Sequence, residues 1–175
     1  MDEPYPAELA GDVVLLDGTP ASIRPIRPED AAALVAFHEH LSAETVYRRF
    51  FGIHPHLTPR EVERFTHVDY RDRLAIVAEI DHLLAAVARY DRLPGTERAE
   101  VAFVVADAYQ HHGLGTLLLT RLVAAARDRG VTSFEAETLE RNRLMREVFR
   151  HAGFPCEEHD VDGVVVVTFP ITPGP

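Results

Sequence analysis

The stretch that decides the fold is AEVAFVVADAYQHHGLGTLLL, residues 99–119. Its apolar start predicts a strand over residues 99–106, and the leucine-rich segment 113–130 predicts a helix. Gly113 and Gly115 lie at the junction between the two. Because glycine lets backbone approach a ligand and the first amides of a helix favour an anion, this stretch predicts a phosphate site made of backbone N–H groups.

Two common phosphate loops are excluded. A dinucleotide fingerprint needs a third glycine, and the chain has Leu118 at that position. The chain also lacks lysine, since all 18 basic residues are arginine. A P-loop nucleotide site and Schiff-base chemistry both need a lysine, so neither fits this sequence.

The composition is that of one globular domain. The chain has 175 residues, of which 46% are hydrophobic and 26% charged. We expect a single domain over residues 1–175 with a core at about 20–170, a frayed head of some sixteen residues and a frayed tail at ITPGP, residues 171–175. The net charge of −10 argues against nucleic-acid binding. No long apolar window and no signal-like start is present, so we expect a cytoplasmic protein without membrane contact.

The remaining patterns predict a mixed α/β sheet with a helical insertion after the first strand. Strands are expected at residues 21–26, 74–80, 84–90, 132–138 and 163–169, and helices at 28–40, 43–51, 59–67 and 141–153, the first opened by Pro28-Glu29-Asp30. The hairpin 74–90 turns at Asp81-His82.

Residues 110–115, QHHGLG, resemble the Q/R-x-x-G-x-G/A loop of the GNAT superfamily of acetyl-CoA-dependent N-acetyltransferases. The resemblance extends to IRPIRPED at 23–30 and to Asn142 followed by HAGF at 151–154. It implies the GNAT fold: a central sheet of about six or seven strands, splayed at the acetyl-CoA site and flanked by helices. More narrowly, residues 47–52, 65–81 and 88–105 resemble the Pat group of bacterial protein lysine acetyltransferases, some of which modify acetyl-CoA synthetase.

The resemblance also implies which residues hold the co-substrate. The loop and helix start would wrap the pyrophosphate, the strand would pair with the pantetheine arm and supply an oxyanion donor, and the late helix would contact the pantetheine from the other side. These residues are Gln110, His111, His112, Gly113, Leu114, Gly115 and Thr116; Phe103, Val104 and Val105; and Asn142 and Met145.

Glu100 is the candidate catalytic base. Ala99-Glu100-Val101 resembles the triplet in which lysine acetyltransferases keep that base. A lysine ammonium has a pKa of about 10.4, so the acceptor must lose a proton before it attacks. An exposed glutamate paired with Arg98 is the structural alternative, and Glu79 is the reserve base. Many family members carry a tyrosine acid seven residues after the asparagine; here that position is Phe149, so the general acid is left open.

Three points stay open at this level. His111 and His112 are either exposed loop residues or, for His112, a titratable charge beside the phosphates. The paired histidines of residues 38–56 lack a matching carboxylate or cysteine cluster, so no metal is expected. The expected acceptor is a lysine of a protein; the alternatives are a small amine, a peptide N-terminus, or a regulatory module that binds acyl-CoA without turnover.

Overall fold

The computed structural model describes residues 3–172, so positions 173–175 of the expected tail lie outside the described residues. It contains one mixed sheet in the order β1-β2-β3-β4-β5-β6-β8-β7, antiparallel throughout except for the parallel pair β5·β6. The strands are β1 Gly11–Val14, β2 Pro20–Pro25, β3 Arg73–Ile80, β4 Leu83–Arg92, β5 Arg98–Val105, β6 Ser133–Leu139, β7 Glu157–Val161 and β8 Val164–Pro170.

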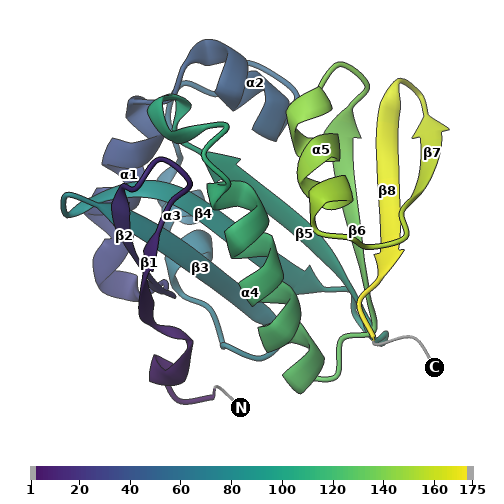
Figure 1. Cartoon of the computed structure of the whole chain (residues 1–175), viewed down its shortest axis with the longest axis horizontal. Coiled ribbons are helices and arrows are strands. Elements are labelled where there is room, and N and C mark those ends of the chain that lie inside the picture. Colours follow the sequence, from purple (N-terminus) through teal and green to yellow (C-terminus); the bar gives the residue numbers. More distant parts are fainter. Residues whose placement is uncertain (1–2, 173–175) are drawn as a thin grey trace.

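Helices cover both faces of the sheet. In Figure 1, α4 and α5 lie on the near face and α1 and α3 on the far face, with α2 above the strand ends. The α-helices are α1 Ala31–Glu39, α2 Ala43–Phe50, α3 Pro59–Thr66, α4 Leu114–Asp128 and α5 Arg143–His151; short 3₁₀ turns span Ala7–Leu9, Pro28–Asp30 and Asp107–Tyr109. None of the helices among residues 3–172 is long and apolar enough to span a bilayer.

Two hydrophobic cores follow from this layering. The larger core packs α4 and α5 on the sheet, and helical spacing places Leu114, Leu118 and Leu122 of α4 on its buried face. The smaller core lies on the other face, where Leu34 and Phe37 of α1 are buried. Strand side chains alternate between the two cores, so neighbouring residues of β5 serve different faces.

Local signals account for the helix boundaries of the insertion. Ser42 caps α2 by accepting a hydrogen bond from the amide of Thr45. Thr58 and Glu61 form a capping box around Pro59 at the start of α3. The predicted helices at 43–51 and 59–67 are therefore confirmed to within one residue.

The feature that makes a site is the separation of β5 from β6. The two strands pair over only three positions, the last being Glu100 opposite Glu135. Beyond that pair β5 continues to Val105 and β6 to Leu139 without pairing to each other. The predicted splay of the sheet is thus present, and Glu100 stands at the fork.

The expectation of a frayed head was wrong. Residues 11–14 form β1, which pairs with β2, and Leu15 after it is 5% exposed. The sheet accordingly has eight strands, not six or seven. At the other end Ile171 is fully buried and its amide donates to the carbonyl of Thr132, so the frayed tail does not begin there. Residues 11–15 and 171 were placed in the frayed ends because short edge elements carry little periodicity of their own.

Candidate active site

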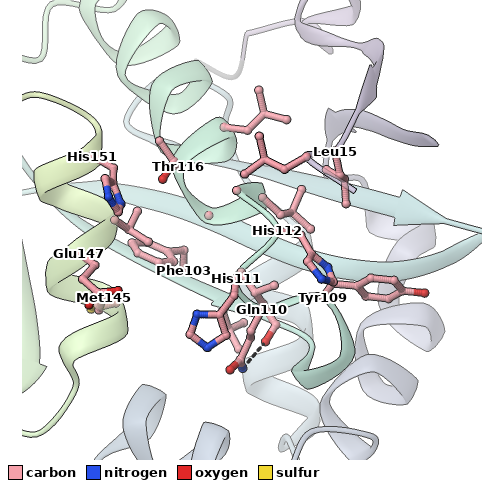
Figure 2. Close-up of a pocket in the computed structure, with 18 of the residues that line it drawn as sticks. Leu15, Phe103, Tyr109, Gln110, His111, His112, Thr116, Met145, Glu147 and His151 are labelled. Atoms are coloured by element: carbon pink, nitrogen blue, oxygen red, sulfur yellow. Dashed lines mark hydrogen bonds between the residues drawn. The ribbon is translucent and has the colours of Figure 1, made fainter. Parts of the chain in front are cut away.

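A cavity of about 680 Å³ opens between α4, α5 and the separated strand β5. This is within the usual range for a site that encloses a small molecule. All twelve residues that the sequence predicted for coenzyme A binding line it, so the structure brings them together, while Glu100 is not among the lining residues. Figure 2 shows Met145, Glu147 and His151 on one wall, Thr116 and the 109–112 loop on the other, and Phe103 at the floor.

The backbone around Gly113 forms the entrance to α4. Gly113 is the N-cap residue with φ +81°, a left-handed conformation that favours glycine. Its carbonyl accepts the first helical hydrogen bond, from the amide of Leu117 at 3.0 Å. The amides before Leu117 in the first turn therefore have no partner within the helix, as an anion site requires.

Gly115 has a different reason to be glycine from the one expected. A β-carbon there would meet Val148 Cγ2 at 3.3 Å and Phe103 Cε2 at 3.6 Å. The glycine therefore lets the first turn of α4 pack closely against α5 and β5.

A polar network holds α2 over the cavity. The carboxylate of Asp107 accepts hydrogen bonds from the Ser42 hydroxyl and the Thr45 hydroxyl, both at 2.7 Å, and from the Ser42 amide at 2.9 Å. Partial burial opposes ionisation, but these hydrogen bonds lower the pKa of Asp107 below its usual value. The Gln110 amide group in turn donates to Thr45 at 3.2 Å and to the carbonyl of Val105 at 3.1 Å. Gln110 thus ties the loop to both α2 and β5.

Asn142 begins α5. Its side chain accepts a hydrogen bond from the amide of Met145 at 3.2 Å, and it is only 6% exposed. Phe149 lies further along α5 and is buried. Its ring centroid is 5.9 Å from that of Phe103 and 5.1 Å from that of Phe169. It has no proton to donate, so it supplies no acid to a leaving thiolate.

Glu100 lies on the opposite face of β5 from Phe103. It is exposed, and Arg98 leans towards Glu135 at 3.9 Å instead of towards Glu100, so the structural alternative of an Arg98 pair does not hold. The pKa of Glu100 is nonetheless raised, first by partial desolvation beside the neighbouring strands and then by the negative charges of Glu137 and Asp91. A raised pKa suits a carboxylate that must accept a proton.

Glu79, the reserve base, is occupied elsewhere. Its carboxylate lies 2.5 Å from the guanidinium of Arg24, which also makes two hydrogen bonds to Asp30 at 2.7 and 2.8 Å. This cluster joins β2, β3 and the turn before α1. Glu79 is therefore part of a structural ion-pair network.

The histidines of the loop differ from each other. His111 has φ +65° and forms the turn before α4. His112 Nδ1 lies 3.8 Å from the carboxylate of Asp17, in the connection between β1 and β2. A charge on His112 would therefore be shared between a bound phosphate and Asp17.

Sequence reasoning missed the part of the site that comes from β1. Val14 and Leu16 are 71% and 85% exposed and both line the large cavity. In the sequence these positions are only part of a short aliphatic run. Their exposure and their place beside Gly113 are visible only in the structure. No group of three or more histidine, cysteine, aspartate or glutamate side chains in the described ranges is placed to hold a metal ion.

The model of the Acetyltransferase (GNAT) family matches residues 35–154. The chain therefore belongs to the GNAT acetyltransferases and is an acyltransferase. It is 33% identical over 154 residues to acetyltransferase Pat of Mycolicibacterium smegmatis, covering 86% of this chain and 46% of that protein. It is 30% identical over 155 residues to acetyltransferase PA5475 of Pseudomonas aeruginosa, covering 86% and 83%.

Solved structures give the same class. The GNAT domain of S. lividans PAT superimposes with a TM-score of 0.90 at 42% identity, over 95% of this chain and 99% of that one. The cAMP-binding acyltransferase of Mycobacterium smegmatis gives a TM-score of 0.66 at 27% identity, over 95% and 49%. The chain thus spans about half the length of the two mycobacterial relatives and nearly all of the S. lividans domain.

Proposed function

We propose that this chain transfers the acetyl group of acetyl-CoA to the side-chain amine of a lysine in a protein. The observation that carries the proposal is the fork between β5 and β6. Residues 103–105 of β5 line the large cavity, and Glu100 stands at the fork three positions before them on the same strand. A thioester held along the splayed strand and a base at the strand's last pair are what direct transfer to an amine requires.

The residues of the cavity fit acetyl-CoA as co-substrate, the one that acetyltransferases of this family use. The amides that follow Gly113 suit a pyrophosphate, and the edge of β5 beyond Glu100 has no strand partner among residues 3–172, so it can pair with an extended pantetheine arm. Bound there, acetyl-CoA supplies an activated acyl group as a thioester. Contact between acetyl-CoA and the twelve residues that the sequence predicted stays a prediction.

Glu100 then accepts the proton of the acceptor ammonium, directly or through a water molecule. The neutral amine attacks the thioester carbonyl while a backbone N–H of residues 103–105 stabilises the developing oxyanion. The acyl group passes straight to the amine in a ternary complex. Because a free thiol has a pKa of about 8.5, the thiolate leaves without a dedicated acid at the Phe149 position. The proton that the nitrogen loses as the amide forms passes to the thiolate or to solvent.

The acceptor is inferred from resemblance to the Pat group, and acetyl-CoA synthetase is the first protein to test. Two similar proteins carry the name Pat, which supports this choice. A cytoplasmic location, predicted from the sequence, accords with it. Acetylation of a small amine or a peptide N-terminus is the second proposal, because the same cavity and base would serve it.

The test is incubation with labelled acetyl-CoA and acetyl-CoA synthetase, with and without its active-site lysine, followed by mass spectrometry. The proposal expects label on that lysine and none on the variant that lacks it. If label appears only on members of a small-amine panel tested in parallel, the second proposal is supported and the first is refuted. Tight CoA binding with no transfer to any amine would mean a regulatory module without turnover.

A further inference from the structure

Two arginine side chains, Arg49 of α2 and Arg89 of β4, line one small cavity beside the large one. This cavity has a volume of about 30 Å³ and lies between the insertion helices and strands β4 and β5. Arg49, Phe103 and Val104 line both cavities. The small cavity therefore adjoins the β5 segment where the thioester would lie.

Arg89 shares a sheet face with Glu100. In the β4·β5 pairing Asp91 is opposite Glu100, and Arg89 is opposite Ala102, two positions further along each strand. Because side chains two positions apart point to the same face, Arg89 and Glu100 emerge on one side of the sheet. Ala102 and Arg89 both line the small cavity.

The charge of Arg89 has no ionic partner among the described residues. The residue is 8% exposed, its guanidinium is 4.1 Å from the ring centroid of Phe65, and no ion pair or hydrogen bond of its side chain is found in residues 3–172. Asp91, the nearest acid on the same strand face, is engaged by Arg73 at 2.8 Å. Desolvation first, and then the charge of Arg49, lowers the pKa of Arg89 to about 9.

Arg49 adds a second donor without an ion pair in the described part of the chain. Its guanidinium lies 4.9 Å from the Phe50 ring centroid, and desolvation lowers its pKa. The other polar side chain in the lining is His38, whose Nε2 is 2.6 Å from the carbonyl of His54. No carboxylate side chain lines the cavity. Arg89 is 8% exposed and Arg49 is half-buried near the charge of Glu100, so both guanidinium groups keep donors that an anion entering the cavity can bind.

We propose that Arg49 and Arg89 form a carboxylate-binding site at the acyl end of the large cavity. A volume of about 30 Å³ has room for a small group such as a carboxylate and not for a ring. Planar guanidinium groups bind carboxylates with paired hydrogen bonds. The carboxylate belongs either to the acyl chain of a dicarboxylic thioester or to an acidic side chain next to the acceptor lysine. The inference rests on the proposed acyl transfer, because that reaction brings both substrates to this point.

Binding measurements with two matched ligand pairs test the site and its source. Succinyl-CoA against butyryl-CoA, compared by calorimetry, tests a carboxylate on the acyl chain. Acetyl-Lys-Glu-amide against acetyl-Lys-Gln-amide, titrated by NMR into the CoA complex, tests a carboxylate on the acceptor. In one pair we expect the carboxylate ligand to bind at least about tenfold more tightly, a difference of about 1.4 kcal/mol.

The variants Arg89→Met and Arg49→Met should each reduce that preference to less than about threefold, since methionine keeps the bulk and removes the charge. Arg60→Met, at an exposed position of α3, is the control and should keep the preference. Equal binding within both pairs, or a preference that survives in both cavity variants, would overturn the site. Acetyl transfer to butylamine, which has no carboxylate, reports the proposed function separately.

Discussion

Replacing Gly113 by alanine tests whether the first turn of α4 binds an anion through its backbone. A β-carbon there would lie 3.1 Å from Leu16 Cδ1, a side chain that is 85% exposed and can move aside. The main effect is on the backbone, because φ is +81°. A non-glycine residue pays about 1–2 kcal/mol in that region, partly offset by about 0.4–1 kcal/mol of lost freedom in the unfolded chain.

The expected net loss is therefore about 1 kcal/mol, or a fall in Tm of about 2–4 °C for a chain of this length. If the strain is relieved by rotation of the adjacent peptide, the amides of the first turn lose their alignment. One hydrogen bond to a charged group is worth about 1.5–3 kcal/mol, so affinity for CoA should fall by about ten- to a hundredfold.

Gly130, at the other end of α4, is the matched control. It has φ +76°, and a β-carbon there would meet nothing within 4 Å. Gly130→Ala should lower Tm by a similar amount and leave CoA affinity unchanged. Calorimetric titration with CoA and thermal unfolding of both variants make the comparison. Equal affinities in the two variants would refute the assignment of the pyrophosphate to this turn.

Three further predictions concern single side chains. Glu100→Gln should lower the rate of acetyl transfer at neutral pH by about 10²–10⁴-fold, whereas Glu79→Gln should leave that rate within about threefold of the parent. Because the pKa of Glu100 is raised, the rate of the parent should rise with pH through a midpoint above the ordinary carboxyl pKa. Arg24→Met should cost about 3–5 kcal/mol in urea unfolding at pH 7, since it strands Asp30 and Glu79. Although desolvation opposes it, Arg24 lowers the pKa of Asp30 in the folded protein, so the Asp30 share of that loss should fade as pH drops below about 4. His112→Asn should leave CoA affinity within about threefold of the parent, because the backbone amides after Gly113 form the anion site; a loss of tenfold or more in calorimetric titration would assign the ring a role at the phosphates.

Much of the fold could be predicted because its long elements carry strong periodicity. The hairpin of β3 and β4 and the leucine face of α4 are large patterns bounded by clear turn residues. The family resemblance then supplied the sheet's splay, which no local pattern contains. β1 was missed because a four-residue edge strand has little periodicity, and its place depends on pairing with β2.

Part of the candidate site could likewise be predicted from the sequence and part could not. The Gly113 loop could be identified because its residues are adjacent in the sequence. The Asp107 network and the Arg49–Arg89 cavity could not, since each joins residues that are about 40 to 65 positions apart. The burial of Arg89 is also invisible in sequence, where an arginine on a strand suggests an exposed or edge position.

The central claim is direct transfer of an acetyl group from acetyl-CoA to a lysine amine. It is tested most directly by intact-mass measurement of both proteins during incubation with isotope-labelled acetyl-CoA and a lysine-bearing acceptor. Because this chain has no lysine, the account predicts label accumulating on acceptor lysines and at most one label, at the amino terminus, on the enzyme. An acetyl group that appears first on an internal residue such as Cys156 and then moves to the acceptor, or an acceptor that stays unlabelled, would contradict it.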